Sequence, residues 1–516
     1  MKKLLEKMRK IILWSPDIRL VAIVAVISFL LLMVPLLRIA VYTVPWYDDY
    51  GYGSYVRNFL SSEYSLSSAL KGAIICVRDQ WWAWQGTFSS IFFMATAPFA
   101  WNEYYYFLGP LFLIIILPVS VFVLAGVLLR SVLKADRSHT LILQATVAAA
   151  VVVFIHSDRA GFYWYNSGVH YVGMHAFLLL TAAAWIKILA GTGKIGTALL
   201  LVWTLFGAVL GGGANFVTAL QGIVFLMSLV ALGALLRKWR TLLLLPSLAV
   251  YLYAFYINVS APGNSTRQAL FSGSGEGVMG AASAVLGSFR EGFRYLWSFT
   301  GLRTWAVVLL LLPVIWQMLK NTEFRFKYPA LVLAWSFCFY ATGFTPSLYA
   351  MGHAGLGRTL NSVKITWQLL LFLNEVYWLG WLRQKTREKG WMADFFLKFR
   401  YRDKTREGVP VCFYLLMGML MFGIFAADPY QDAHYSSFCA YWYVHTGEAN
   451  EFHKEYLARV ETIVNGGSVV EVAPYHFKPA PICVDDLSAD PDNEANRFMA
   501  SWYGKEAIIC KSADTD

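Results

Sequence analysis

The chain contains 516 residues, of which 58% are hydrophobic and only 15% are charged, and its mean hydropathy is +0.50. A soluble domain of this size needs more polar surface to cover its core, so the composition excludes a soluble protein and predicts a polytopic helical protein in a lipid bilayer. The formal net charge of +11 therefore requires no nucleic-acid partner.

Apolar runs of about 17 to 25 residues, long enough to cross ~30 Å of hydrocarbon, recur along the chain. They predict eleven transmembrane helices: Arg19–Tyr42, Tyr104–Leu129, His139–His156, Gly168–Ile188, Ile195–Gly211, Asn215–Leu236, Thr241–Ile257, Leu302–Leu319, Tyr328–Phe344, Leu360–Leu382 and Pro410–Ala426. Another apolar stretch, Phe88–Ala100, is too short and too close to the next segment to be predicted as a crossing.

Lys and Arg residues gather at the N-terminus, in alternate loops and most densely between Arg383 and Arg406. The positive-inside rule places these segments on the cytoplasmic face. We therefore predict a multi-pass protein of the plasma membrane, with a cytoplasmic N-terminus and an extracytoplasmic C-terminus. Gln384–Arg406 is typical of a juxtamembrane amphipathic helix on the inner leaflet, and a solvated loop is the alternative.

The composition changes after Ala426, where the chain becomes polar and mixed in charge. Its pattern predicts a helix, a strand and a second helix, at Phe452–Ile463, Ser468–Val472 and Asn493–Tyr503. We predict a transmembrane module of residues 1–427, whose first outer loop is 43–103, and a small extracytoplasmic α/β domain of residues 428–516. A disulfide is compatible with that compartment, and the pairing stays open among Cys76, Cys439, Cys483 and Cys510.

Asp48 and Asp49 stand side by side a few residues beyond the first predicted span. Two carboxylates at this place suit the removal of a proton from a hydroxyl group beside the bilayer. The structural alternative is that one of them caps a short helix predicted from Ser54 to Lys71. The acidic pair is the first candidate for a catalytic group.

The other unusual polar groups also fall on the predicted outer face. Sugars stack on aromatic rings, and an anionic phosphate needs Arg or Lys donors, so these groups favour a carbohydrate site. Each also has a structural interpretation, because aromatic residues at a membrane boundary form an interfacial belt and buried histidines are commonly hydrogen-bonded. The chain has no Cys-x-x-Cys spacing, so no zinc site is predicted.

Five short motifs carry a family resemblance: Asp48-Asp49-Tyr50, Trp84–Phe88, Gly211–Asn215, Pro262-Gly263-Asn264 with Arg267, and Gly357-Arg358-Thr359. Together they resemble the GT-C superfamily of integral-membrane glycosyltransferases, and more closely a bacterial branch with an Asp-Asp-Tyr motif after the first span. Related chains often carry an acidic residue near the third outer loop, where this chain has Asn215.

The resemblance implies a GT-C-like helical fold and inverting transfer of a sugar from a polyprenyl-phosphate donor to a glycan or lipid acceptor. Asp48 or Asp49 would be the general base. Four arginines would hold the donor phosphate: Arg267, Arg358, Arg159 and Arg78. The implied sugar- and acceptor-binding residues are Tyr50, Trp84, Trp164, Asn166, His170, Asn215, Asn264 and His353. Some family members use a divalent cation, and the acidic pair alone does not decide whether this chain does.

Two other functions fit the predicted topology. A transporter or flippase of a lipid-linked saccharide would explain eleven spans and outer arginines, but it would place polar groups near the midplane. Glu375 is the main such group here, and a structural role is its first interpretation. An O-antigen polymerase or ligase would share the lipid-linked donor, but such proteins keep their key residues in large outer loops between later spans.

Overall fold

The computed structural model describes residues 14–271, 273, 275, 277–389, 413–414, 417–418 and 436–511. Three predictions fall on the remaining residues. The eleventh predicted span, Pro410–Ala426, lies outside the described residues except for four positions. Most of the predicted juxtamembrane segment Gln384–Arg406 and the domain boundary at 427/428 also lie outside them.

Among the described residues, eight helical segments are long and apolar enough to cross a membrane. Their bounds are Ile18–Ala40, Glu103–Val132, Tyr165–Ala190, Lys194–Gly212, Phe216–Leu235, Trp239–Val259, Leu302–Asn321 and Pro329–Met351. Each overlaps a predicted span, so the prediction of a multi-pass α-helical membrane protein is confirmed. The count of eleven spans stays a prediction.

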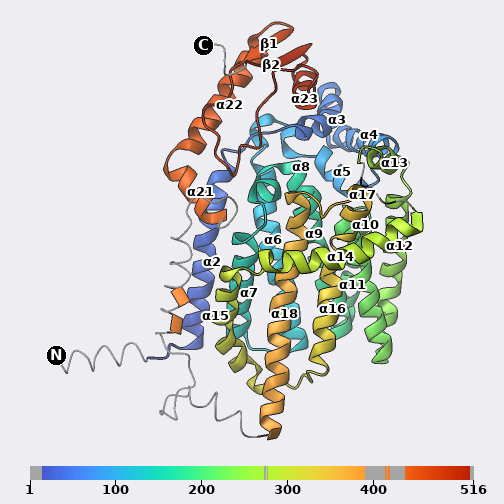
Figure 1. The fold of residues 1–516 in the computed structure, drawn as a ribbon, viewed down its shortest axis with the longest axis vertical. Helices are drawn as coiled ribbons and strands as arrows, with labels where there is room; N and C mark the ends of the chain where they lie inside the picture. The colour runs from blue at the N-terminus through green and yellow to red at the C-terminus, as the bar shows by residue number, and fades with distance from the viewer. Residues whose placement is uncertain are drawn as a thin grey trace, which may run out of the picture.

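These segments contain α2 (Ile18–Ala40), α6 (Leu108–Gly126), α9 (Met174–Ala190), α10 (Lys194–Gly212), α11 (Phe216–Leu235), α12 (Leu245–Val259), α15 (Leu302–Met318) and α16 (Pro329–Ala341). Two further helices run along them in the bundle of Figure 1. They are α7 (Arg137–Val153) and α18 (Gly357–Lys389), which correspond to the third and tenth predicted spans. α18 is long enough to cross, but its buried Asn361, Gln368 and Glu375 lower its hydropathy.

Shorter helices cover the end of the bundle at which α2 ends, near the top of Figure 1. They are α3 (Asp48–Ser62), α4 (Leu66–Ala83), α5 (Phe88–Ala95), α8 (Tyr165–Gly168), α13 (Gly263–Gln268) and α17 (Thr345–Met351). The single helix predicted from Ser54 to Lys71 is wrong, because Ser65 accepts a hydrogen bond from the N–H of Ser68 and so caps a new helix, α4. The eight residues of α5 are too few to cross a membrane.

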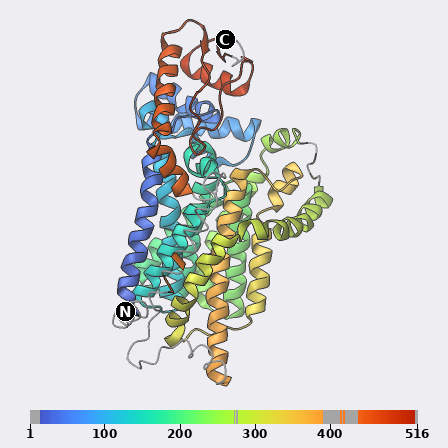
Figure 2. The same cartoon turned by 60° about the vertical axis from the view of Figure 1, so that its left-hand side comes forward.

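One long helix was not predicted. α14 (Gly277–Phe299) runs across the bundle instead of along it, as Figures 1 and 2 show from two sides. Its exposed apolar side chains recur at helical spacing, with Leu286, Phe293 and Trp297 each more than 60% exposed. A helix with one exposed apolar face is typical of a membrane interface, so we expect α14 to be a further juxtamembrane helix.

The C-terminal residues form α21 (Ser436–His445), α22 (Glu448–Asn465), β1 (Val469–Val472), α23 (Glu494–Tyr503) and β2 (Ala507–Cys510). The two strands pair in parallel, with Val469 opposite Ala507. Both predicted helices and the predicted strand are confirmed. α21 was not predicted, and it packs against α2 and α7. Cys76, Cys338, Cys483 and Cys510 are free thiols, so no disulfide joins these four residues.

Candidate active site

Asp49 is completely buried and its carboxylate is held by three donors. Oδ2 accepts hydrogen bonds from the backbone N–H of Trp46 (2.9 Å) and the hydroxyl of Tyr106 (2.8 Å). Oδ1 accepts a hydrogen bond from the backbone N–H of Asn166 (3.0 Å). Asp49 therefore joins the first outer loop to two other chain segments, which is a positioning role.

Asp48 is only partly buried and has fewer partners. Its Oδ1 accepts a hydrogen bond from the indole N–H of Trp164 (3.0 Å), which leaves Oδ2 without a hydrogen bond to another residue in the described part of the chain. Its backbone carbonyl accepts a hydrogen bond from the side-chain amide of Asn166 (2.8 Å). The N-cap of α3 is Tyr47, with no side-chain cap, so the capping interpretation of the acidic pair is wrong.

The two carboxyl groups also differ in their electrostatics. Burial raises the pKa of Asp48, and the positive charge of Arg358 and the hydrogen bond from Trp164 oppose this rise. Burial raises the pKa of Asp49 further, because the charge of Asp48 adds to the effect. Asp48 is therefore the member of the pair that ionises at the lower pH, and it is also the one with an available oxygen.

Arg358 lies in the first turn of α18, near enough to Asp48 for its charge to act on that carboxyl group. Its guanidinium group stacks over the ring of Trp164, 5.4 Å from the ring centroid. It forms no ion pair or hydrogen bond within the described ranges, although its charge acts on both Asp48 and Tyr47. Trp164 thus contacts a carboxylate through its N–H and a guanidinium through its face, which leaves the donor groups of Arg358 available to an anion.

Arg267 approaches the same region from α13. Its Nη1 donates a hydrogen bond to Oε1 of Gln85, and its guanidinium lies 5.8 Å from the ring centroid of Trp84. The charges of Arg267 and Arg358 both act on the ring of His170, whose Nδ1 lies 2.8 Å from the hydroxyl of Ser90. Two arginines from distant parts of the sequence therefore lie close enough to one buried ring for both charges to act on it.

A cavity of about 550 Å³ has Arg267 in its wall. Arg267, His170, Asn215 and Thr359 contribute to its polar lining, and Thr359 follows Arg358 directly. The rest of its wall is largely apolar and comes from α11, α12, α14 and α17. An arginine beside an apolar cavity at a membrane boundary suits an anionic group attached to a lipid chain.

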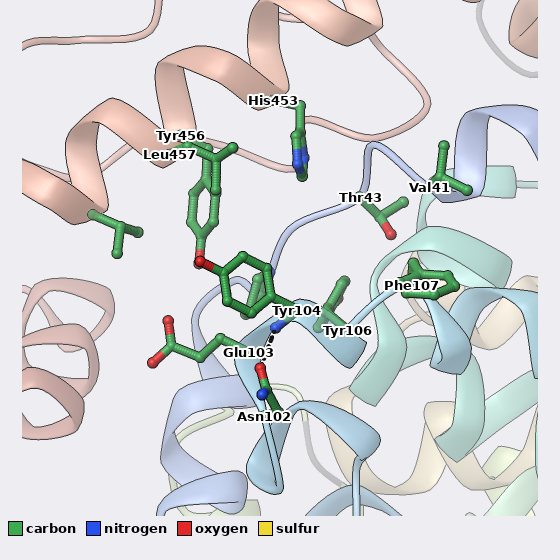
Figure 3. A pocket seen from close by; sticks show the side chains of 12 residues that line it. Val41, Thr43, Asn102, Glu103, Tyr104, Tyr106, Phe107, His453, Tyr456 and Leu457 are labelled. Carbon is green, nitrogen blue, oxygen red and sulfur yellow. Dashed lines mark hydrogen bonds between the residues drawn. The ribbon is translucent and has the colours of Figure 1, made fainter.

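A second cavity, of about 490 Å³, has Tyr106 in its wall, the residue whose hydroxyl contacts Asp49, and Figure 3 shows the side chains that line it. Side chains from the segment after α2, from the loop Asn102–Phe107 and from α22 surround it. Its wall includes Tyr104, Tyr456 and His453, and Glu103 at its edge accepts hydrogen bonds from three other side chains. Tyr106 thus touches Asp49 with its hydroxyl and this cavity with its ring.

Comparisons with known proteins found no relative. No protein-family model, no curated protein and no solved structure matches the chain. Membership of the GT-C superfamily therefore stays a prediction from the short motifs and the arrangement of the site.

Several predicted binding residues have structural roles. Asn215 caps α11 and also donates a hydrogen bond to the carbonyl of His170 (2.6 Å). Tyr50 is buried against α23 and lies 3.2 Å, hydroxyl to hydroxyl, from Tyr456. Asn166 holds the backbone and side chain of the acidic pair. Asn215 also lines the larger cavity, whereas Tyr50 and Asn166 line neither of the two cavities described above. These residues therefore shape the site through their hydrogen bonds and packing.

Other predicted residues lie apart from the acidic pair or are already bound. Arg78 is bound to its neighbour Asp79 and its side chain is 65% exposed. Arg159 donates a hydrogen bond to the carbonyl of Val484 in the C-terminal residues (3.1 Å). His353 is exposed and accepts a hydrogen bond from the N–H of Gly355. Arg267 and Arg358 are therefore the predicted arginines that the structure brings to the site.

Asn264 fastens the loop that carries Trp84. Its side chain accepts a hydrogen bond from the N–H of Gly86 (3.0 Å) and donates one to the carbonyl of Asn258 (2.8 Å). The backbones approach so closely that a Cβ atom on Gly86 would lie 1.9 Å from the carbonyl oxygen of Asn258. This contact holds Gln85, the partner of Arg267, in place.

Replacing Gly86 with Ala is expected to destabilise the protein by about 1–3 kcal/mol, because the added methyl group forces the two loops apart. The readout is the Tm of the purified protein in detergent. Gly467→Ala is the control, since a Cβ there meets no atom within 4 Å. Equal Tm values for both variants would show that the loops separate without cost.

Two site residues had no sequence signal. Tyr47 has a left-handed backbone (φ 50°), which strains a bulky residue, and its hydroxyl donates a hydrogen bond to Glu494 of α23. The negative charge of Glu494 also acts on Asp48. Tyr47 precedes the predicted acidic pair directly, but the sequence does not reveal its strained φ angle. No sequence pattern connects Glu494 with Tyr47 or with the acidic pair.

The side chains around the acidic pair do not form a metal site of the usual kind. No group of three or more His, Cys, Asp or Glu side chains that could hold a metal occurs in the described residues. Both oxygens of Asp49 already accept hydrogen bonds, so the pair offers one available carboxylate. Within the described residues, the pair therefore lacks an all-protein ligand set for the divalent cation that some GT-C members use.

Proposed function

We propose that the chain is a glycosyltransferase of the plasma membrane, of the GT-C type, that transfers a sugar from a polyprenyl-phosphate donor to a hydroxyl group of a glycan or lipid on the extracytoplasmic face. One observation carries the proposal. Asp48, a carboxylate with an available oxygen, lies near Arg358, which forms no ion pair with any residue that the structure describes, and a second arginine lines a cavity close by. Asp48 can therefore act as a base, and the two arginines can bind an anion.

In the proposed reaction Asp48 takes the proton from the acceptor hydroxyl as its oxygen attacks the anomeric carbon. The bond between the anomeric carbon and the phosphate oxygen breaks, and its electron pair leaves with the lipid phosphate. Arg358 and Arg267 stabilise the negative charge on that leaving group, which needs no proton. Attack from the face opposite the phosphate inverts the anomeric centre.

The two cavities suit the two substrates. The larger cavity has an apolar wall and an arginine, which fits a prenyl chain and its phosphate. The cavity beside Tyr106 has aromatic rings, against which sugar faces stack, so it fits a saccharide acceptor. Tyr106 links the smaller cavity to Asp49, and Thr359, which follows Arg358 directly in the chain, lines the larger one.

The experiment that tests the function compares cell-surface glycans by mass spectrometry in a deletion strain with and without the restored gene. If the protein is a transferase, the deletion strain is expected to lack one discrete sugar in its surface glycans. The polyprenyl-phosphate form of that sugar is expected to accumulate on the extracytoplasmic side. A complete block in export, with the lipid-linked precursor trapped inside, would favour the flippase. If the glycans of the two strains were the same, the proposed transfer reaction would be wrong.

Replacing Arg358 with Gln is expected to move the acid limb of the pH–rate profile to higher pH. Burial raises the pKa of Asp48 and the charge of Arg358 lowers it, so the pKa rises further when that charge is lost. Asp48 is then protonated, and inactive as a base, over more of the acidic range. The rate is measured in membranes that contain the lipid-linked sugar accumulated by the deletion strain. Arg78→Gln is the matched control, and an unmoved limb in Arg358→Gln would contradict this arrangement.

A further inference from the structure

A third cavity lies at the end of the bundle opposite the acidic pair. It is an open pocket of about 700 Å³, at the place where α6 ends, α7 begins and α9 approaches its C-terminus. Four basic side chains contribute to its lining: Arg130, Lys134, Arg137 and Lys187. This end of the bundle is the predicted cytoplasmic face.

The positive charge of this cavity is not neutralised by the part of the chain that the structure describes. None of the four basic residues forms an ion pair with a carboxylate there. Asp136, which lies between Lys134 and Arg137 in the sequence, is engaged elsewhere. It accepts hydrogen bonds from the N–H groups of Ser138 and His139, and its Oδ2 lies 2.5 Å from the His139 ring.

The backbone around the cavity has an unusual shape. The last turn after α6, Val127–Val132, is a π-helix, a rare form that occurs frequently at functional sites. Lys134 follows in a left-handed conformation (φ 59°), which is uncommon for a residue with a side chain. Lys187 reaches across from α9 and donates a hydrogen bond to the hydroxyl of Ser131 (2.9 Å). These features bring basic groups from three helices to one cavity.

We propose that this cavity binds a phosphate group, presented either by an anionic lipid of the adjacent leaflet or by a soluble phosphate compound. Guanidinium and ammonium groups that converge without a counter-ion are the donors that phosphate oxygens require. The positive-inside rule explains the sign of these charges, but it does not explain why four of them share one cavity. The site is separate from the acidic pair and does not depend on the proposed transfer.

The test uses the purified full-length protein in detergent and three probes: phosphatidylglycerol, phosphatidylcholine and inorganic phosphate. Native mass spectrometry follows lipid retention, and thermal unfolding follows protection by each probe. In Arg130→Gln/Arg137→Gln, binding of the anionic probe is expected to weaken by at least about tenfold. The control is Lys194→Gln/Lys238→Gln, which removes two exposed charges from the same end of the bundle but outside the cavity lining.

The probes separate the two sources of phosphate. Selective retention of phosphatidylglycerol, lost in the Arg130/Arg137 variant and kept in the control, supports a lipid headgroup. Protection by inorganic phosphate alone, with the same dependence on the variants, supports a soluble ligand. Arg130→Lys/Arg137→Lys keeps the charge and is expected to keep most of the binding. Absence of binding by every probe, or equal weakening in both double variants, would overturn the proposal.

Discussion

Replacing Asp48 with Asn is expected to lower sugar transfer by at least about 10²-fold without reducing the amount of folded protein in the membrane. An asparagine accepts the hydrogen bond from Trp164 as the carboxylate does, so the local structure keeps this contact. It cannot take a proton from the acceptor hydroxyl, so the proposed base is lost. The measurement is mass spectrometry of the cell-surface glycans, with the protein quantified in the same membranes.

Asp79→Asn is the matched control for this prediction. Asp79 is a partly exposed aspartate of α4 that is paired with Arg78, and it lines none of the three cavities described above. The control is expected to transfer sugar at the normal rate. If Asp48→Asn also restored the normal glycan, Asp48 would not be the base and the proposed chemistry would be wrong.

The helices of the bundle could be predicted because lipid-facing helices are apolar along most of their length, as in α2 and α6. α14 escaped prediction because only one of its faces is apolar, so it has no continuous apolar run that would mark it as a helix. α3 and α4 were merged because the boundary between them is one serine cap at Ser65, and serine also occurs within helices. Apolar runs were thus sufficient to predict the membrane-crossing helices, whereas the interfacial helices could be identified only from the tertiary structure.

The site shows a similar division. The adjacency of Asp48 and Asp49 is visible in the sequence, but the difference between them is not. It comes from Tyr106 and Asn166, whose donors reach Asp49, and from Arg358, whose charge acts on Asp48. These partners are far apart along the chain, and residue type alone does not indicate which arginine or aromatic residue will meet a given carboxylate.

Replacing Asp49 with Asn is expected to destabilise the folded protein, in contrast to the same change at Asp48. The carboxylate of Asp49 faces two backbone N–H groups, of Trp46 and Asn166, on its two oxygens. An asparagine has one acceptor oxygen, so its amide group must face one of these donors. Tyr106 can turn its hydroxyl to the carbonyl of Tyr163 (3.2 Å), but the backbone donors cannot turn. One buried N–H group therefore loses its partner, which costs about 1–3 kcal/mol.

This cost predicts a lower Tm in detergent and less folded protein in the membrane for Asp49→Asn, with Asp48→Asn close to the unmodified chain in both. Asp49→Ala is expected to be worse, because it leaves both backbone donors unpaired and adds a cavity at a completely buried position. Size-exclusion chromatography of solubilised membranes measures the folded fraction. If Asp49→Asn were as stable as the unmodified chain and inactive, Asp49 itself would take part in the chemistry, and the separation of roles between the two aspartates would be lost.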